Sequence, residues 1–165
     1  MLPIMLDPAR LQIGLVGRGD LALRRLAWFE RQGVRPGLFS DAPAQSFAAS
    51  AGDRLIPRLP DSGDLAALDV LWIADLDLPS AAALAARARA AKVLVNVEDE
   101  LAYCDFHTPS VVTRGSLSIA AGTGGASPAV ASVVREILEE TFPVSWESAL
   151  ADISSARARL REAGA

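Results

Sequence analysis

Apolar runs of strand length alternate with helical segments through the first hundred residues. The clearest runs are LQIGLV (11–16), DVLWIA (69–74) and KVLVNV (92–97), with weaker ones at 34–39 and 54–59. Strands that are apolar on both faces occur in parallel sheets covered by helices on either side. Helices are expected over 20–31 and, opened by Pro79, over 80–90. The sequence therefore predicts an α/β fold around a parallel sheet.

The pattern changes after about residue 100. Apolar segments at 110–113 and 116–122 flank an Arg-Gly turn, which predicts a β-hairpin. Ser127 and Pro128 then open a helix with one apolar face, and Pro143 ends it before an amphipathic helix over 148–165. We expect two parts, residues 1–108 and a hairpin-helix module over 109–165. The apolar helix face needs a partner, and a second protomer in a homodimer is the natural one.

Charge and composition exclude several classes of protein. The net charge of −4 disfavours a nucleic-acid partner, which calls for a basic surface. No apolar run approaches the ~20 residues of a membrane span, and the N-terminus lacks the basic start of a signal peptide. One cysteine and one histidine exclude an internal disulfide and a zinc site of these residues, so no metal site is expected. A reducing cytoplasm is the expected location.

A glycine-rich loop follows the first strand. Gly17, Arg18, Gly19, Asp20, Leu21 and Ala22 form a G-x-G-x-x-A pattern between a strand and a helix, the context of a dinucleotide-binding loop in a Rossmann-like sheet. Asp41 lies after the second strand, where an acidic residue would bind the ribose and favour NAD over NADP. The alternative is a simple glycine turn in a fold without a cofactor.

Two further segments carry candidate functional residues. The stretch NVEDELAYCDF (96–106) places acidic side chains at the carboxyl edge of the sheet. They could act as a general base or as oxygen ligands for a divalent metal, or remain solvated turn residues. The loop GTGGASP (122–128) could present backbone N–H groups to an anion or merely connect hairpin and helix. Cys104 is expected to be packed rather than reactive.

Taken in order, these segments resemble one family. LPIMLD (2–7), LVGRGDLALRR (15–25) and the stretch from Val95 to Glu136 are similar to the precorrin-2 dehydrogenase/sirohydrochlorin ferrochelatase family, the module found in siroheme synthases. The resemblance covers nearly the whole chain. It implies an opening strand at 2–7, a Rossmann domain, a dimerisation module and a helical tail. It also implies NAD-dependent oxidation of precorrin-2 to sirohydrochlorin, with ferrous iron or cobalt as a further substrate in chelating members.

The same resemblance assigns the site. Asp99 would be the general base. The cofactor would be bound by Gly17, Arg18, Gly19, Asp20, Leu21, Asp41 and Ala42. The tetrapyrrole would be bound by Asn96, Arg114, Thr123, Gly124, Gly125 and Ser127, because its carboxylates suit backbone donors and an arginine.

The chain also departs from the family pattern. Arg18 replaces the middle glycine of the loop and would either crowd or clasp a pyrophosphate. Glu100 follows the key aspartate, and a proline expected just beyond it is missing. The helical tail is shorter than in the family, which weakens the case for chelatase activity more than the case for dehydrogenase activity. An alternative function is therefore a non-catalytic homologue that binds a tetrapyrrole or a dinucleotide.

Overall fold

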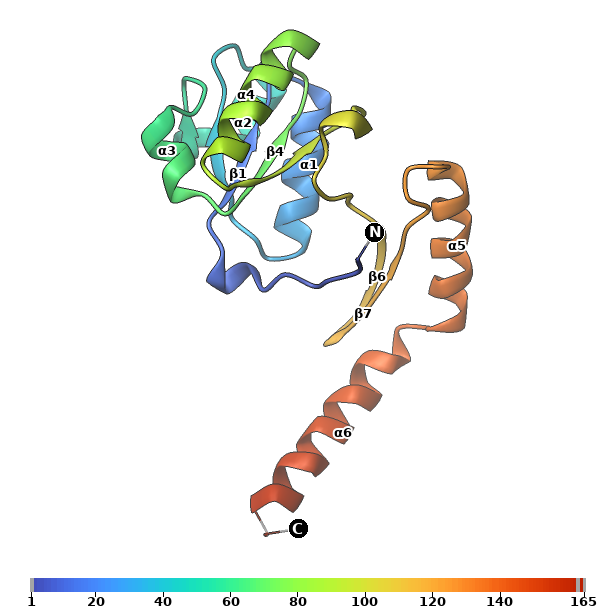
Figure 1. Cartoon of the computed structure of the whole chain (residues 1–165). Coiled ribbons are helices and arrows are strands. Elements are labelled where there is room, and N and C mark those ends of the chain that lie inside the picture. Colours follow the sequence, from blue (N-terminus) through green and yellow to red (C-terminus); the bar gives the residue numbers. More distant parts are fainter. Residues whose placement is uncertain (1, 163, 165) are drawn as a thin grey trace. The chain divides into compact units, whose positions relative to one another are not determined.

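The computed structural model describes residues 2–162 and 164 and divides the chain into two compact units. The first unit ends at Phe106 and the second begins at His107, close to the boundary expected after residue 108. Figure 1 shows the elements of both.

A parallel five-stranded sheet forms the centre of the first unit, in the order β3-β2-β1-β4-β5. Its strands are β1 (Ile13–Val16), β2 (Gly37–Phe39), β3 (Leu55–Ile56), β4 (Val70–Ile73) and β5 (Leu94–Val97). Val16 of β1 pairs with Phe39 of β2 on one side and with Ile73 of β4 on the other. The predicted α/β fold with a parallel sheet is confirmed. The β2 strand is shorter than predicted, because Pro36 has no N–H to donate to a neighbouring strand.

Helices cover both faces of this sheet. One buried cluster joins the sheet to α3 (Ser62–Ala67) and α4 (Leu78–Ala90), and the other joins it to α1 (Asp20–Arg31) and α2 (Gln45–Ala51). Short 3-10 helices occur at η1 (Pro8–Arg10), η2 (Gly52–Arg54) and η3 (Leu101–Tyr103). The structure confirms α1 at its predicted bounds, whereas α4 begins before residue 80 because Asp77 caps it by accepting a hydrogen bond from the Ser80 N–H.

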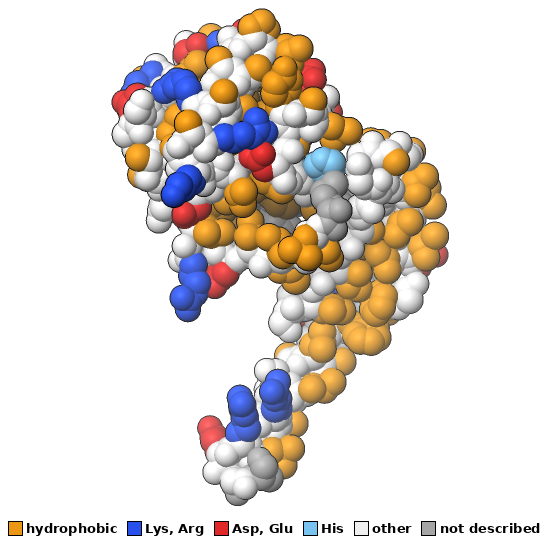
Figure 2. Space-filling model, in the orientation of Figure 1, with side chains coloured by type: hydrophobic (Ala, Val, Ile, Leu, Met, Phe, Trp, Pro, Cys, Tyr) orange, Lys and Arg blue, Asp and Glu red, His pale blue; other side chains and the backbone are white. Residues whose placement is uncertain are grey.

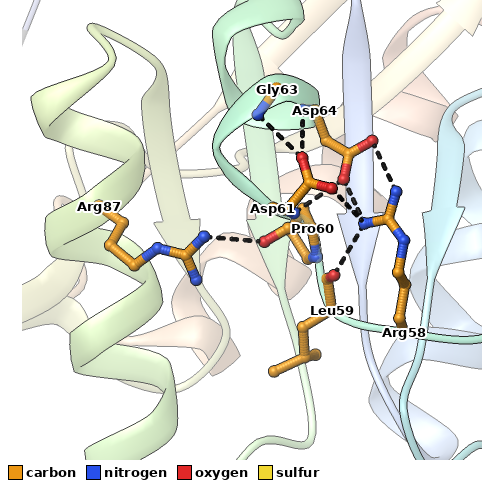
Figure 3. Close-up of polar contacts among 7 residues, drawn as sticks. All are labelled: Arg58, Leu59, Pro60, Asp61, Gly63, Asp64 and Arg87. Atoms are coloured by element: carbon orange, nitrogen blue, oxygen red, sulfur yellow. Dashed lines mark hydrogen bonds and ion pairs between the residues drawn. The ribbon is translucent and has the colours of Figure 1, made fainter.

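The helix α3 was not predicted, and its first turn explains why it forms (Figure 3). The Asp61 carboxylate accepts from the backbone N–H groups of Gly63 and Asp64, and the Asp64 carboxylate accepts from the Asp61 N–H at 2.8 Å. This reciprocal capping box stabilises a helix that is too short to form alone. Arg58 pairs with Asp64, and the Arg87 side chain of α4 donates to the Pro60 carbonyl.

The opening segment differs from the expectation. Residues 2–7, expected from the family resemblance to form a strand, have no regular secondary structure, and the side chains of Leu2, Ile4 and Met5 are exposed. Neither β1 nor its neighbours offers this segment an edge, since both sides of β1 are already paired. Asp7 instead caps the 3-10 helix that begins at Pro8.

The second unit contains a hairpin and two helices. The strands β6 (Ser110–Arg114) and β7 (Leu117–Ala121) pair antiparallel, and Gly115 makes the turn at φ +59°. The helix α5 (Pro128–Thr141) begins at the predicted Ser127 cap, and α6 (Ser145–Glu162) begins earlier than the expected residue 148. Of the expected helix over 148–165, residues 163 and 165 lie outside the described residues.

This unit has little core of its own. Val112 is its one fully buried hydrophobic side chain among the described residues, and α5 and α6 have no buried residue. Figure 2 shows hydrophobic side chains along both helices. Within residues 2–162 and 164, no helix combines the length and apolarity needed to cross a membrane.

Candidate functional site

The turn between β1 and α1 packs as the glycine pattern predicts. A Cβ atom at Gly17 would lie 2.2 Å from the Ala22 Cβ and 3.1 Å from the Ala74 carbonyl oxygen, so no side chain fits there. The Gly17 N–H donates to the Phe39 carbonyl, which ties the turn to β2. Gly17 and Ala22 therefore let α1 start close to the sheet, and this brings the N-terminal N–H groups of α1 to the carboxyl edge.

Those N–H groups bind a side chain of this chain. The Asp75 carboxylate accepts from the backbone N–H groups of Gly19, Leu21 and Ala22, at 3.0, 3.3 and 2.8 Å. Asp75 follows β4, which lies beside β1 in the sheet, and it has a left-handed backbone with φ +56°. Its negative charge is well placed at the positive end of the α1 dipole. The sequence analysis did not identify Asp75, because only the strand order brings it to the loop.

Arg18 and Asp41 form an ion pair at the same edge. The Arg18 guanidinium donates from Nε and Nη2 to the two Asp41 carboxylate oxygens, each at 2.8 Å, and Nη1 lies 3.4 Å from Asp77. The hydrogen bonds from Arg18 lower the pKa of Asp41 below its ordinary value. The structure thus brings together two of the residues predicted to bind the cofactor, Arg18 and Asp41. Asp20 and Ala42, which were predicted with them, are exposed beside them in the chain.

A small cavity opens beyond Asp75, at the ends of β4 and β5. It has a volume of about 110 Å³ and is lined by Leu21, Ile73, Asp75, Leu76, Leu78, Ala81, Val97, Glu98 and Glu100. Its wall is apolar except for three carboxylates. Pockets at the carboxyl edge of an open parallel sheet are where such folds bind ligands.

Asp99 lies on the turn that follows β5. Its side chain is exposed, and its backbone has φ +63°, which is uncommon outside glycine and marks a constrained turn. The preceding Glu98 is anchored by Arg25 of α1, whose Nε and Nη2 both lie 2.5 Å from Glu98 Oε1. The Arg25 guanidinium also lies over the Trp28 ring, 5.0 Å from its centroid. This pair, which the sequence analysis missed, fixes the turn of Asp99 to α1.

Asn96 and Cys104 have structural contacts in the first unit. The Asn96 side chain is 6% exposed, and its Nδ2 donates to the Phe106 carbonyl at 2.9 Å. The Cys104 Sγ accepts from the Val97 N–H and donates to the Val97 carbonyl. Burial raises the pKa of the Cys104 thiol, in line with the packed role expected for it. A role of Asn96 in substrate binding stays a prediction.

The residues predicted to bind substrate in the second unit hold that unit together. Arg114 donates from Nε to the Phe142 carbonyl at 2.6 Å and from Nη2 to the Glu139 carbonyl, which joins β6 to the C-terminal end of α5. The Thr123 hydroxyl accepts from the Ser127 N–H and donates to the Ser127 carbonyl, each at 3.1 Å. Gly124 and Gly125 lie between them at positive φ. The two hydrogen bonds between Thr123 and Ser127 therefore order this loop.

The first unit fits a dinucleotide in its shape and donor groups. The glycine turn allows close backbone approach, the α1 N–H groups suit a pyrophosphate, and Asp41 follows β2, the position at which Rossmann-type domains carry an acidic residue for the ribose. The N–H groups that would bind the pyrophosphate are already in use, because three of them donate to the Asp75 carboxylate.

The sheet and its glycine loop define a Rossmann-type dinucleotide-binding domain. Residues 4–110 match the family described as "Putative NAD(P)-binding", and the chain belongs to this family. The resemblance to siroheme synthases is confirmed. The siroheme synthase of Thiobacillus denitrificans is 31% identical over 165 residues, which are 98% of this chain and 34% of that protein. Siroheme synthase 1 of Pectobacterium atrosepticum is 32% identical over 149 residues, 87% of this chain and 31% of that protein.

A solved structure has the same fold. The structure titled "SirC, precorrin-2 dehydrogenase" superposes with a TM-score of 0.69 at 23% identity and covers 96% of this chain and 79% of that one. The expected fold, a parallel sheet followed by a hairpin and helices, is therefore confirmed. The chain spans about a third of the length of the siroheme synthases it matches.

Proposed function

We propose that this chain oxidises precorrin-2 to sirohydrochlorin in siroheme synthesis, with a nicotinamide dinucleotide as the oxidant. The observation that carries the proposal is the extent of the match to a siroheme synthase, which takes in 98% of the chain. The NAD(P)-binding family alone ends at residue 110. The match to siroheme synthases therefore also includes the hairpin and the helices beyond residue 110.

The site supplies groups that suit this oxidation. The reaction removes a hydride and a proton from the macrocycle, and the bound dinucleotide would take the hydride. Asp99 would accept the proton, since it is an exposed carboxylate on the turn after β5, at the same sheet edge as the glycine loop. The Arg25–Glu98 pair would hold that turn in place.

An Asp99→Asn variant tests this role. Asparagine tolerates the positive φ of residue 99, so the turn is retained while the base is lost. We expect kcat for precorrin-2 oxidation to fall about a hundredfold or more, with an unchanged Kd for the dinucleotide. The matched control is Asp53→Asn, an exposed carboxylate in η2 that should leave kcat unchanged. Wild-type kcat in Asp99→Asn would exclude Asp99 as the base.

We propose NAD rather than NADP as the cofactor, on the basis of Asp41. A carboxylate after β2 accepts from ribose hydroxyls and repels a 2′-phosphate. Titration with each dinucleotide should give a lower Kd for NAD⁺, and Asp41→Ala should reduce the difference. Equal values of Kd for both dinucleotides would contradict this assignment.

A homodimer formed through the second unit is also proposed. Val130, Val133 and Ile137 lie along α5 at helical spacing and are each more than half exposed, in a unit with almost no core. A second copy that covers this face would bury them. Light scattering should show a dimer for the wild type, and Val133→Asp with Ile137→Asp should give a monomer. A wild-type monomer at micromolar concentration would contradict the proposal.

One observation favours a second candidate function. Arg18 binds both oxygens of Asp41, so the acid proposed for the ribose is already paired. A homologue that binds a tetrapyrrole without turnover would have no need of a free ribose acid. That candidate predicts sirohydrochlorin binding with no dinucleotide binding to any form of the protein, and observed turnover of precorrin-2 would exclude it.

A further inference from the structure

Asp75 occupies the positions that a dinucleotide needs. The N–H groups of Gly19, Leu21 and Ala22 converge on its carboxylate, and these are the groups that a helix N-terminus offers to a pyrophosphate. A Cβ on Gly19 would lie 3.3 Å from the Asp75 carboxyl carbon, so the side chain lies directly against the glycine turn. A phosphate oxygen and an Asp75 oxygen cannot occupy the same place.

We propose that Asp75 is a built-in competitor for the pyrophosphate, so that a dinucleotide binds only by displacing this carboxylate from the loop. The inference rests on the dinucleotide cofactor of the proposed function. It identifies Asp75 as the residue that sets the affinity of the site.

The competition is effective because Asp75 is part of the chain. A tethered ligand acts at an effective concentration that is millimolar or higher, without a loss of overall translation on binding. After displacement, its negative charge would remain near the phosphates, because residue 75 lies two positions after the end of β4, at the edge of the cavity. Tethering and repulsion both raise the Kd of a dinucleotide. Saturating concentrations would still overcome them, because the Asp75 side chain is only half-buried.

The test is calorimetric titration of the full chain with NAD⁺, for the wild type and Asp75→Asn. Asparagine keeps one acceptor oxygen for the loop and tolerates φ +56°, so the variant should fold. The control is Asp53→Asn, which removes an equal charge from an exposed side chain in η2. We expect Asp75→Asn to bind NAD⁺ at least tenfold more tightly than the wild type, and Asp53→Asn to differ from the wild type by less than threefold.

A second measurement locates the competition. In amide NMR spectra, addition of NAD⁺ to the wild type should shift the N–H signals of Gly19, Leu21 and Ala22, and Asp75→Asn alone should shift the same signals. An Asp75→Asn protein that binds NAD⁺ no more tightly than the wild type would overturn the competitor proposal. A different result would contradict the proposed function, namely that neither protein oxidises precorrin-2 at saturating NAD⁺.

Discussion

Gly17→Ala should destabilise the first unit, because the new methyl group clashes with the Ala22 side chain. The new Cβ would lie 2.2 Å from the Ala22 Cβ, about 1.5 Å inside the ordinary separation of two carbon atoms. The start of α1 must move away, together with its buried side chains at Leu26 and Phe29. Overpacking of this kind costs about 3 kcal/mol. With a urea m value of about 2 kcal/mol/M, the unfolding midpoint should fall by about 1.5 M.

Ala22→Gly supplies the matched control, because it removes the atom that Gly17→Ala meets. Alone it should cost about 2 kcal/mol, from helix propensity and one lost buried methyl group. The double variant should cost clearly less than the sum of the two single effects, because the closest contact of the new Cβ is gone and only the tighter approach to the Ala74 carbonyl oxygen at 3.1 Å remains. Urea unfolding followed by tryptophan fluorescence at one fixed protein concentration gives all three values. If the two single effects simply add in the double variant, the clash is not the cause and the reasoning is refuted.

Three further predictions concern local contacts. Asp61→Ala removes the cap of α3 and should lower the free energy of unfolding by about 1 kcal/mol in urea titrations, whereas an unchanged midpoint would show that the capping box is unimportant. Because burial raises its pKa, the Cys104 thiol should react with iodoacetamide at pH 8 at least tenfold more slowly than in urea, and equal rates would contradict its packing. The Arg18–Asp41 pair lowers the pKa of Asp41, so its stabilisation should be fully present above the unfolded carboxylate's pKa of about 3.9 and lost as the pH falls through the lower folded value. Since these side chains are 27% and 37% exposed, Asp41→Asn should cost less than about 1 kcal/mol at pH 7 and nothing at acidic pH, and a difference that persists in acid would contradict this origin.

The elements that the sequence predicted well are those with strong local signals. The helix α1 begins after the glycine turn and ends at Arg31, as predicted, because its apolar spacing and its glycine boundaries agree. The helices α2 and α3 were missed, because they are short and each follows a weak strand segment that contains a proline. The Asp61-x-x-Asp64 capping box was visible in the sequence and would have indicated α3. The strand expected at 2–7 was wrong, since strand pairing depends on a free edge that no local pattern reveals.

The candidate site was predictable only where its residues follow a strand in a known pattern. Gly17, Gly19 and Asp41 lie at the edge that the pattern assigns to a cofactor, although what they bind remains a prediction. The contacts of Asp75 and Glu98 depend on residues more than fifty positions away in the chain. Such contacts follow from the order of β1, β4 and β5 in the sheet, which the alternation of strands and helices does not determine.

Oxidation of precorrin-2 tests the central claim most directly. The purified protein is incubated anaerobically with precorrin-2, with and without saturating NAD⁺, and the visible absorption spectrum is followed. We expect the spectrum of sirohydrochlorin to develop only when NAD⁺ is present, together with stoichiometric NADH. An unchanged spectrum from folded wild-type protein and from Asp75→Asn, at NAD⁺ concentrations that saturate both, would contradict the assignment as a precorrin-2 dehydrogenase.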